Sequence, residues 1–308
     1  MGNGLNLPFA VAVDAKGDVF IADTGNNRVV EVPAGGGAQT TIGSGLNGPS
    51  GVAVDGAGDV FIADAYNNDV VEVPSSSGAQ IAVGNGLNQP YGLAVDGAGN
   101  IFIADTGNGR VVEVPVGGGS QFTVARGFGF PAGVAVDGAG DVFIVDTYND
   151  DVVEVPAGGG AQITVASGLN LPSGVAVDAA GDVIIADTYN QRVAEIPAGG
   201  GAPITLYSPL VNTLGVAANG KGDIFVADNL DLYLGGGQCQ LQPVGYGPER
   251  RQSVLECCDA GLKYRHRFQT SSRDRHALRL HSHVVAGNRR KRQPEPRLYA
   301  ADCRQFQR

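Results

Sequence analysis

The sequence predicts an all-β protein made of repeated four-stranded units, and three observations lead to this prediction. Glycine supplies 48 of the 308 residues, which disfavours helices because glycine costs about 1 kcal/mol at an interior helical position. Five prolines stand 41 residues apart with no insertion between them. Between these prolines, short apolar runs rich in β-branched residues are bounded by glycine, asparagine and proline, which is typical of β-strands.

The proline spacing defines the repeat. The prolines are Pro8, Pro49, Pro90, Pro131 and Pro172, and Thr213 holds the same place in a sixth, degraded copy. In the first copy the pattern predicts strands near residues 10–14, 18–23, 28–32 and 38–42. Four antiparallel strands in about 40 residues are typical of one blade of a β-propeller.

The turn between the first two strands of each copy carries a glycine at a constant position. These glycines are Gly17, Gly58, Gly99, Gly140, Gly181 and Gly222. A three-residue hairpin needs a left-handed residue near its end, and glycine adopts that conformation without steric cost. Asp14 and its repeats flank the turn, where they are expected to accept hydrogen bonds from its amides.

The repeated motif resembles a known family. Pro-x-x-Val-Ala-Val-Asp at residues 8–14, followed by Gly-Asp-Val-Phe-Ile-Ala-Asp-Thr-Gly-Asn-Asn-Arg-Val at residues 17–29, closely resembles the NHL repeat, and the resemblance extends over about residues 5–230. It implies a six-bladed β-propeller. It implies little about activity, because propellers of this kind include both binding proteins and enzymes.

The chain divides by composition near residue 235. Residues 1–234 contain 6 Lys and Arg against 25 Asp and Glu, a net charge of −19, whereas residues 235–308 contain 15 against 6, a net charge of +9. We predict an NHL-like propeller over residues 1–234 and an aperiodic basic tail over residues 235–308. The six copies lie near residues 5–45, 46–86, 87–127, 128–168, 169–209 and, in degraded form, 210–234.

Closure of the ring is open to two interpretations. The sixth copy ends early, so its blade must find outer strands after Asp228, and the alternating segments Leu230–Leu234 and Cys239–Val244 are candidates. The alternative is a five-and-a-half-bladed, incompletely closed ring, which exposes blade edges to other chains.

The tail allows three interpretations. It is a disordered basic arm that binds nucleic acid or an acidic partner, or it holds a zinc site, or it is an out-of-frame product, which we favour because the period is lost abruptly. The zinc interpretation fits poorly, because the cysteines are adjacent and the histidines scattered. Its candidate ligands are Cys257, Cys258, His281, His283 and Cys303. We expect residues 245–308 to pack poorly and to lack contact with the propeller core.

Candidate binding residues are those that break the repeat on the face carrying the turns between second and third strands. They are Tyr66, Tyr148, Tyr189, Arg28, Arg110 and Arg192, with Arg126, Phe128 and Phe130 just before the proline of the fourth copy. Tyrosine and arginine are frequent anchors of binding surfaces. The alternative is structural: tyrosine packs on the neighbouring blade and arginine pairs locally with aspartate or glutamate.

Catalytic groups are scarce in the repeats. Residues 1–234 contain neither histidine nor cysteine, whereas related lyases, the amidating lyase and virginiamycin B lyase, are expected to use channel histidines. We therefore predict no catalytic residue, no metal ligand and no cofactor. The favoured function is a non-catalytic binding or sensor module that takes a protein or a small or polymeric ligand on the turn-bearing face.

The alternative function is a calcium-assisted hydrolase or lyase, similar to gluconolactonase, with its site on the propeller axis. Such a site needs different acidic residues from different blades, whereas the aspartates of the first turn repeat almost identically, as a structural role demands. They are Asp14, Asp55, Asp96, Asp137 and Asp178.

Targeting signals are the last feature of the sequence. No run of about 20 apolar residues is present, and Met1-Gly2-Asn3-Gly4 lacks the basic and apolar regions of a signal peptide. We expect no membrane contact, and nucleic-acid contact only through the basic tail. The sequence does not predict a compartment.

Overall fold

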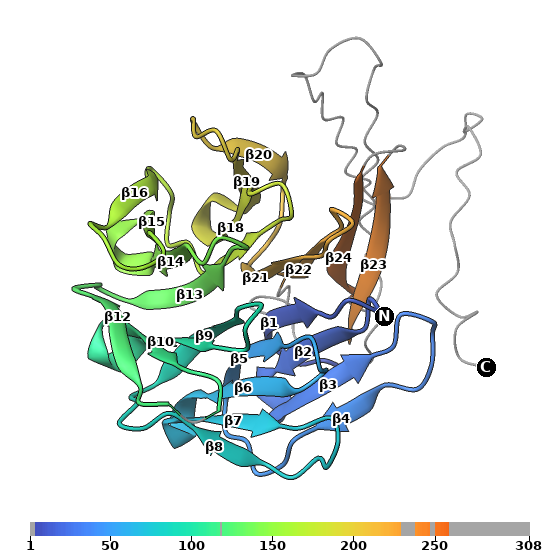
Figure 1. Ribbon diagram of the computed structural model, residues 1–308. Helices are drawn as coiled ribbons and strands as arrows, with labels where there is room; N and C mark the ends of the chain where they lie inside the picture. The colour runs from blue at the N-terminus through green and yellow to red at the C-terminus, as the bar shows by residue number, and fades with distance from the viewer. Residues whose placement is uncertain (1–3, 118, 229–237, 247–249, 259–308) are drawn as a thin grey trace, which may run out of the picture. The chain divides into compact units, whose positions relative to one another are not determined.

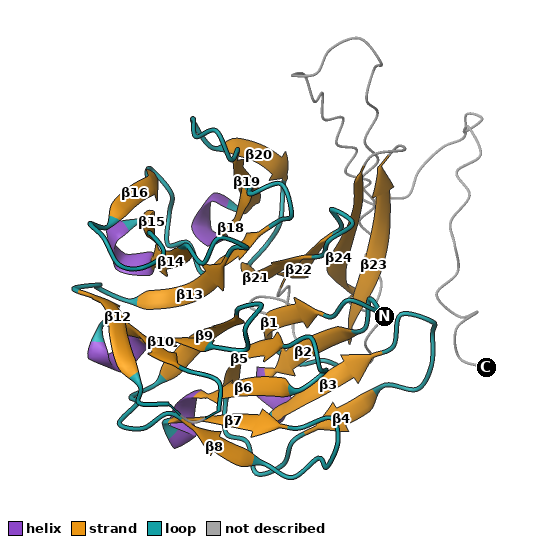
Figure 2. Cartoon of the chain, viewed as in Figure 1, coloured by secondary structure: helices purple, strands orange, loops and turns teal. Residues whose placement is uncertain are grey.

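The computed structural model describes residues 4–117, 119–228, 238–246 and 250–258. It divides the chain into two compact units, Met1–Leu262 and Lys263–Arg308; the second unit, with the candidate residues His281, His283 and Cys303, lies outside the described residues. The first unit contains six four-stranded sheets (Figure 1). The only helices among the described residues are turns of 3-10 type, three residues long (Figure 2).

Five sheets repeat one up-and-down antiparallel pattern, in which each strand pairs with the next along the chain. The innermost strands are β1 (Pro8–Val13), β5 (Pro49–Val54), β9 (Pro90–Val95), β13 (Pro131–Val136) and β17 (Gly174–Val177), with β21 (Thr213–Ala218) in the sixth sheet. The second strands are β2 (Val19–Asp23), β6 (Val60–Asp64), β10 (Ile101–Asp105), β14 (Val142–Asp146), β18 (Val183–Asp187) and β22 (Ile224–Asp228).

The outer half of each regular blade has the same periodicity. The third strands are β3 (Arg28–Val32), β7 (Asp69–Val73), β11 (Arg110–Val114), β15 (Asp151–Val155) and β19 (Arg192–Ile196). The outermost strands are β4 (Thr40–Ile42), β8 (Ile81–Val83), β12 (Phe122–Arg126), β16 (Ile163–Ala166) and β20 (Ile204–Tyr207). The 3-10 turns between second and third strands are η1 (Thr24–Asn26), η2 (Ala65–Asn67), η3 (Thr106–Asn108), η4 (Thr147–Asn149) and η5 (Thr188–Asn190). The propeller fold and the strand phase predicted from the sequence are confirmed.

The first hairpin turn has the predicted chemistry. Asp14 Oδ1 accepts hydrogen bonds from the amides of Lys16 (2.9 Å) and Asp18 (2.8 Å), and Gly17 is left-handed with φ +92°. The other five turn glycines have φ between +78° and +91°. The aspartate and the glycine therefore form one turn motif that all six copies share, with Asn219 in place of the aspartate in the last copy.

We predict that Gly99→Ala lowers the free energy of unfolding by about 1–2 kcal/mol, because alanine resists the left-handed conformation and its Cβ would lie 3.1 Å from Val116 Cγ2. Gly97→Ala, two residues away, is the matched control: its Cβ would meet nothing within 4 Å, and other copies carry Ala15 and Ala179 there. Urea unfolding measures both. Equal losses would mean that the turn is assigned to the wrong residues.

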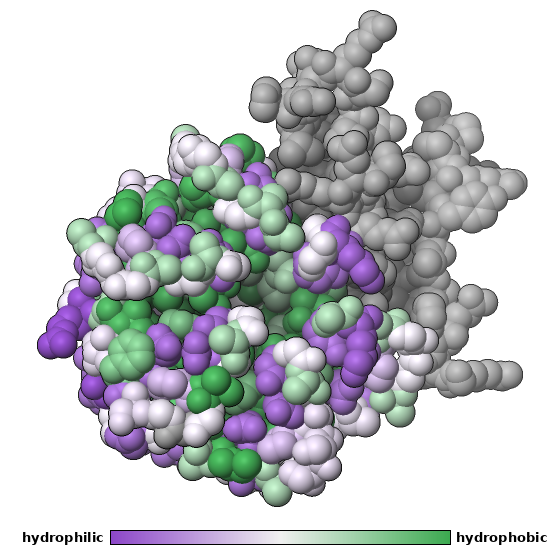
Figure 3. Space-filling model, viewed as in Figure 1, coloured by the Kyte–Doolittle hydropathy of each residue, from purple (hydrophilic) through white to green (hydrophobic). Residues whose placement is uncertain are grey.

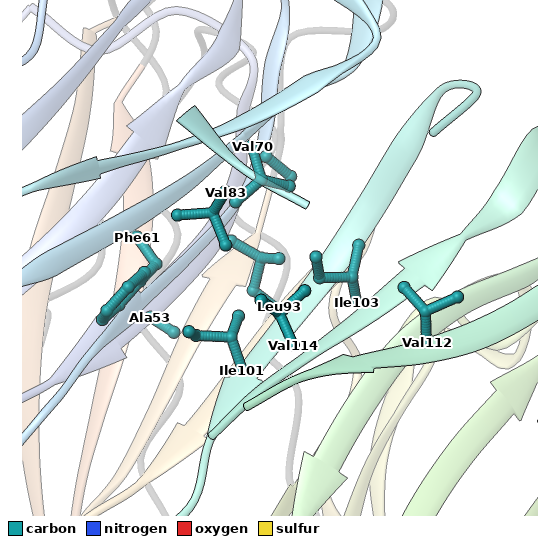
Figure 4. Close-up of a cluster of buried hydrophobic side chains, with 10 residues drawn as sticks. Ala53, Phe61, Val70, Val83, Leu93, Ile101, Ile103, Val112 and Val114 are labelled. Atoms are coloured by element: carbon teal, nitrogen blue, oxygen red, sulfur yellow. The ribbon is translucent and has the colours of Figure 1, made fainter. Parts of the chain in front are cut away.

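The hydrophobic core lies between blades. Figure 4 shows one such interface, where Ala53, Phe61, Val70 and Val83 of the second blade face Leu93, Ile101, Ile103, Val112 and Val114 of the third. Five further clusters of this kind join the other neighbouring sheets. Because β-strands bury alternate side chains on opposite faces, each blade contributes one face to each of two clusters.

Hydroxyl groups add polar links between blades on the face that carries the 3-10 turns. Thr24 Oγ1 donates to the Pro49 carbonyl of the next blade at 2.6 Å. The same link recurs from Thr106, Thr147 and Thr188 at 2.6–2.8 Å. The second blade has Ala65 at this position, and there Ser50 Oγ donates to the Pro90 carbonyl at 3.0 Å. The missing threonine is thus replaced by a serine of the inner strand.

The first and sixth sheets are in contact. Leu5, Val11 and Ile21 of the first blade pack in one cluster with Phe225 and Ala227 of β22. A Cβ on Gly215 of β21 would lie 2.8 Å from the Phe9 carbonyl of β1. The inner strands of the first and sixth blades therefore meet, and the structure has five regular blades and a partial sixth.

The sixth sheet differs from the other five. Its outer strands are β23 (Gln238–Tyr246) and β24 (Arg250–Cys258), and β24 rather than β23 adjoins β22, in parallel. The expectation that Cys239–Val244 forms a strand of this sheet is confirmed, although as the outermost strand; Leu230–Leu234 lies outside the described residues.

This sheet corrects one expectation about the tail. Residues 250–258 were expected to lack contact with the propeller core, but β24 pairs with β22 between Ile224↔Gln252 and Val226↔Val254. The free edge of β22 presents backbone N–H and C=O groups that this pairing satisfies. Residues 259–308 lie outside the described residues, and the division into a propeller and a tail at residue 235 stays a prediction.

The surface seen in Figure 3 alternates between polar and apolar residues, with apolar areas deeper in the hollow near its middle. Such scattered apolar residues are ordinary for a folded surface. Among the described residues, no helix is long and apolar enough to cross a membrane.

Candidate functional site

The face that carries η1–η5 is called the loop face. Each 3-10 turn is bound to the segment that enters its blade: in the first blade the Gly25 amide donates to the Asn6 carbonyl at 2.9 Å, and in the fourth the Thr147 amide donates to the Phe130 carbonyl at 3.0 Å. The loop face is therefore assembled from two segments per blade, which come from different parts of the repeat.

A buried aspartate at the end of each second strand holds these two segments together. In the first blade Asp23 Oδ1 accepts the Asn6 amide at 2.6 Å, and Asp23 Oδ2 accepts from Asn26 Nδ2 at 2.8 Å. The main-chain donor lies 17 residues before the aspartate, in the segment that enters the blade.

Three of the candidate arginines complete these aspartate sites. Arg28, Arg110 and Arg192 each place Nε 2.6 Å from the carboxylate of a fully buried aspartate, which is Asp23, Asp105 or Asp187 respectively. A terminal nitrogen of each arginine also donates: Arg28 to the Gly4 carbonyl, Arg110 to the Gly86 carbonyl and Arg192 to the Thr205 hydroxyl. This geometry favours the structural alternative for these three residues.

The second and fourth blades carry an aspartate where the others carry arginine. Asp69 lies directly opposite Asp64, and Asp151 opposite Asp146. The Oδ1 atoms of Asp69 and Asp151 are buried with no hydrogen-bond partner. Burial raises the pKa of both carboxyls, and the charges of Asp146 and Asp150 add to the rise in the pKa of Asp151. Burial also raises the pKa of Asp64, and the charge of Asp69 adds to that rise.

These aspartate pairs predict an unusual pH dependence of the free energy of unfolding. A carboxyl with a raised pKa in the folded state stabilises the fold at low pH, and that contribution is lost as pH rises through the raised pKa. Asp69→Asn should therefore increase the free energy of unfolding at pH 7 by about 0.5 kcal/mol, the cost of like charges directly opposite on two strands. Its advantage should shrink as pH falls towards 3.8, the ordinary aspartate value. Urea unfolding over this pH range tests it, and a benefit that does not change with pH would contradict it.

Aromatic side chains from three blades meet on the loop face. Phe9 and Tyr91 contact edge to face with ring centroids 5.4 Å apart, Tyr91 and Phe130 do so at 5.3 Å, and Phe130 and Tyr148 lie tilted at 4.9 Å. We call these four residues the aromatic cluster. Phe9 and Tyr91 are the second residues of innermost strands, so the cluster lies at the inner end of the blades.

Tyr148 is the exposed member of this cluster, and Tyr66 of the second blade is similarly exposed. The exposed fraction of Tyr148 is 66%, and that of Tyr66 in the second blade is 62%. Burial raises the pKa of Tyr91, and the nearby Tyr66 and Tyr148 add to the rise. The site thus has half-buried rings at its base and two exposed phenols at its border.

The loop that carries Phe130 is held firmly. Asp146 Oδ1 accepts the amides of Gly129 and Phe130, both at 3.0 Å. The Phe130 carbonyl accepts the Thr147 amide of η4. Phe130 and Tyr148 are brought together because this one aspartate and this one turn bind the loop beside them.

The repeat is identified by comparison with known families. The NHL repeat matches residues 5–31, 46–71, 87–113 and 169–195. The chain is an NHL-repeat protein. The matched segments fall on the first, second, third and fifth copies, and the fourth copy, which carries Phe130 and Tyr148, retains the blade structure in β13–β16. No curated protein matches the chain in sequence.

Solved structures share the NHL propeller fold at low sequence identity. A gluconolactonase from Xanthomonas campestris is 17% identical with a TM-score of 0.63, over 73% of this chain and 84% of that one. A streptogramin B lyase is 12% identical with a TM-score of 0.60, over 72% and 76%. A chain of a nidogen–laminin complex is 20% identical with a TM-score of 0.58, over 62% and 76%. These likenesses show the all-β propeller fold.

The other sequence candidates of the NHL propeller lie apart from the cluster. Phe128 is buried in the core beside Val134 and Ile144, at the position where the other copies carry leucine. Arg126 is exposed at the end of the outermost strand β12, opposite Arg110. Tyr189 is 65% exposed in the fifth blade and makes none of the three ring contacts.

Phe9 and Tyr91 were missed by the sequence analysis. They stand directly after the repeat proline, where the six copies carry Phe9, Ser50, Tyr91, Ala132, Ser173 and Leu214. This position breaks the repeat as clearly as the turn tyrosines do, so the same criterion could have found it. Among the described residues, no group of three or more His, Cys, Asp and Glu side chains could hold a metal ion.

Proposed function

We propose that this NHL propeller is a non-catalytic binding module whose contact site is the aromatic cluster with Tyr66. The observation that carries the proposal is the convergence of rings from three blades beside two tyrosines that are more than 60% exposed. Tyrosine supplies a large contact area at a low cost in conformational entropy, which is why it is enriched in binding sites.

A protein is the proposed partner. The neighbour in the nidogen–laminin complex is a propeller chain crystallised with a protein, which supports this choice by analogy of fold. The loop face also suits a protein surface, because its segments are anchored by buried aspartates and by hydroxyl links between blades. A rigid site loses little entropy on binding.

The residues give less support to the alternative, a calcium-assisted hydrolase or lyase. Oδ1 of the first-turn aspartates accepts hydrogen bonds from turn amides, as in Asp14 and Asp55 of the first two blades, so these oxygens already have local partners. One propeller neighbour is a virginiamycin B lyase from Staphylococcus aureus made inactive by replacing a histidine, and residues 1–234 of this chain contain no histidine. The chemistry of that neighbour therefore finds no counterpart in the repeats.

Selection of peptides from a displayed random library on the immobilised full chain tests the proposal. We expect enriched peptides whose affinity falls at least tenfold with Tyr148→Ala, as for a hot-spot residue. Tyr189→Ala is the matched control, since Tyr189 has the same turn position and exposure outside the cluster. No enrichment, or peptides that bind Tyr148→Ala as well as the original chain, would refute the proposal.

A further inference from the structure

The carboxylates near the site flank the same two turns that carry its exposed tyrosines. The two turns that carry Tyr66 and Tyr148 are each flanked by two carboxylates, Asp64 with Asp69 and Asp146 with Asp151. No arginine among the residues that the structure describes joins these pairs, unlike the buried aspartates of the first, third and fifth blades. Within the described residues, the exposed tyrosines of the site therefore stand beside carboxylates that have no ion pair.

The arginines of the loop face are bound to other groups or lie away from the site. Arg28, Arg110 and Arg192 are bound to buried aspartates, and Arg126 lies at the outer edge of its blade, opposite Arg110. Residues 1–234 carry 25 acidic against 6 basic residues. The aromatic cluster thus lies in a negative field with four rings exposed or half-buried, and the face of an aromatic ring attracts cations.

We infer that the aromatic cluster binds a cationic side chain, arginine or lysine, presented by a protein partner. This inference rests on the proposed function and names the chemistry of its ligand. The rings supply cation–π contacts, and the carboxylates beside Tyr66 and Tyr148 supply a countercharge that no ion pair among the described residues neutralises. An anionic or purely apolar partner would leave these carboxylates uncompensated.

The ring arrangement suits a flat or compact cation. Tyr91 meets Phe9 and Phe130 at interplanar angles of 78° and 74°, so the rings present both edges and faces. Asp146 lies directly behind the site: a Cβ at Gly129 would be 3.4 Å from Asp146 Oδ1 and 3.2 Å from Tyr148 Cβ. A cation over Tyr148 or Phe130 therefore approaches a carboxylate from the solvent side.

Titration of the full chain with two capped pentapeptides tests the inference. One is Gly-Gly-Arg-Gly-Gly and the other carries citrulline, a neutral isostere of arginine. The sequence contains no tryptophan and nine tyrosines, so tyrosine emission follows binding, and the Tyr148 variant shows how much of the change comes from the site. We expect the arginine peptide to bind saturably and the citrulline peptide roughly fivefold more weakly, as the loss of a cation–π contact predicts. Affinity for the arginine peptide should also fall with added salt.

Three variants locate the effect. Tyr148→Leu should lower the affinity for the arginine peptide several-fold, and so should the double variant Asp69→Asn, Asp151→Asn. Tyr189→Leu should leave this affinity unchanged. Unfolding midpoints no lower than that of the original chain show that the variants are folded; the double variant is expected to be slightly more stable, because it removes like-charge repulsion. Equal affinities for the two peptides, no saturable binding, or equal losses in Tyr148→Leu and Tyr189→Leu would overturn the inference. Library peptides whose binding depends on Tyr148 but which contain no basic residue would overturn the inference of a cationic ligand. The proposed binding function would still stand.

Discussion

Replacing Asp105 by alanine is expected to lower the free energy of unfolding by about 3–5 kcal/mol, the cost of removing one partner of a buried ion pair. Asp105 is 0% exposed and accepts hydrogen bonds from the Asn88 amide, Asn108 Nδ2 and Arg110 Nε at 2.6–2.9 Å. The Asn88 amide and Arg110 Nε would lose their acceptor, and Asn108 Nδ2 would keep only the Gly86 carbonyl. Urea unfolding followed by circular dichroism measures the loss.

A comparison between blades provides the control for this prediction. Asp105→Asn keeps the shape of the side chain but removes the charge that Arg110 needs. Asp64→Asn makes the same change in the second blade, where Asp69 replaces the arginine and the substitution relieves repulsion. We expect Asp64→Asn to cost clearly less than Asp105→Asn. Equal costs would show that Arg110 contributes nothing to the role of the buried aspartate.

Replacing Gly51 by alanine is expected to lower the free energy of unfolding by about 3 kcal/mol, the upper end of the usual cost of overpacking. A Cβ at Gly51 would overlap the backbone oxygen of Tyr91 on the next inner strand. Backbone cannot rotate away as a side chain can, so β5 or β9 must move. Because Tyr91 belongs to the aromatic cluster, peptide binding should fall together with stability.

Gly56→Ala in the same blade is the control for Gly51→Ala. A Cβ at Gly56 would meet nothing within 4 Å, and the first and fifth copies carry Ala15 and Ala179 at this position. Its effect should stay within about 0.5 kcal/mol. A Gly51→Ala variant as stable as Gly56→Ala would mean that the inner strands lie farther apart than they do in this structure.

Much of the blade was predictable because the repeat is local. The 41-residue period, the alternation of apolar residues and the turn glycines predicted each strand of the regular blades to within about two residues. The same locality explains the turn motif of Asp14 and Gly17, whose hydrogen bonds join residues at most four apart. Local signals of this kind need no knowledge of the neighbouring blade.

The candidate site was predictable only in part. Tyr66, Phe130 and Tyr148 were found because they break the repeat, but Phe128 breaks it too and is buried in the core. The arginines also broke the repeat, and they pair with buried aspartates five residues away. A change in residue type shows where a copy differs, but it does not show whether the side chain points inward, to a local partner or to solvent.

The sequence by itself determined the blade: its strands, its turns, the number of copies and their resemblance to the NHL repeat. Only the tertiary structure decided which residues of different blades meet. Phe9 and Tyr91 lie 82 positions apart in the numbering of the chain, and their rings touch because closely packed inner strands bring the second residues of two blades together. The parallel pairing of β22 with β24 was also decided at this level. Contacts between blades and across the ring depend on how whole sheets pack and on which backbone edge is free. The 41-residue period of a single copy determines neither.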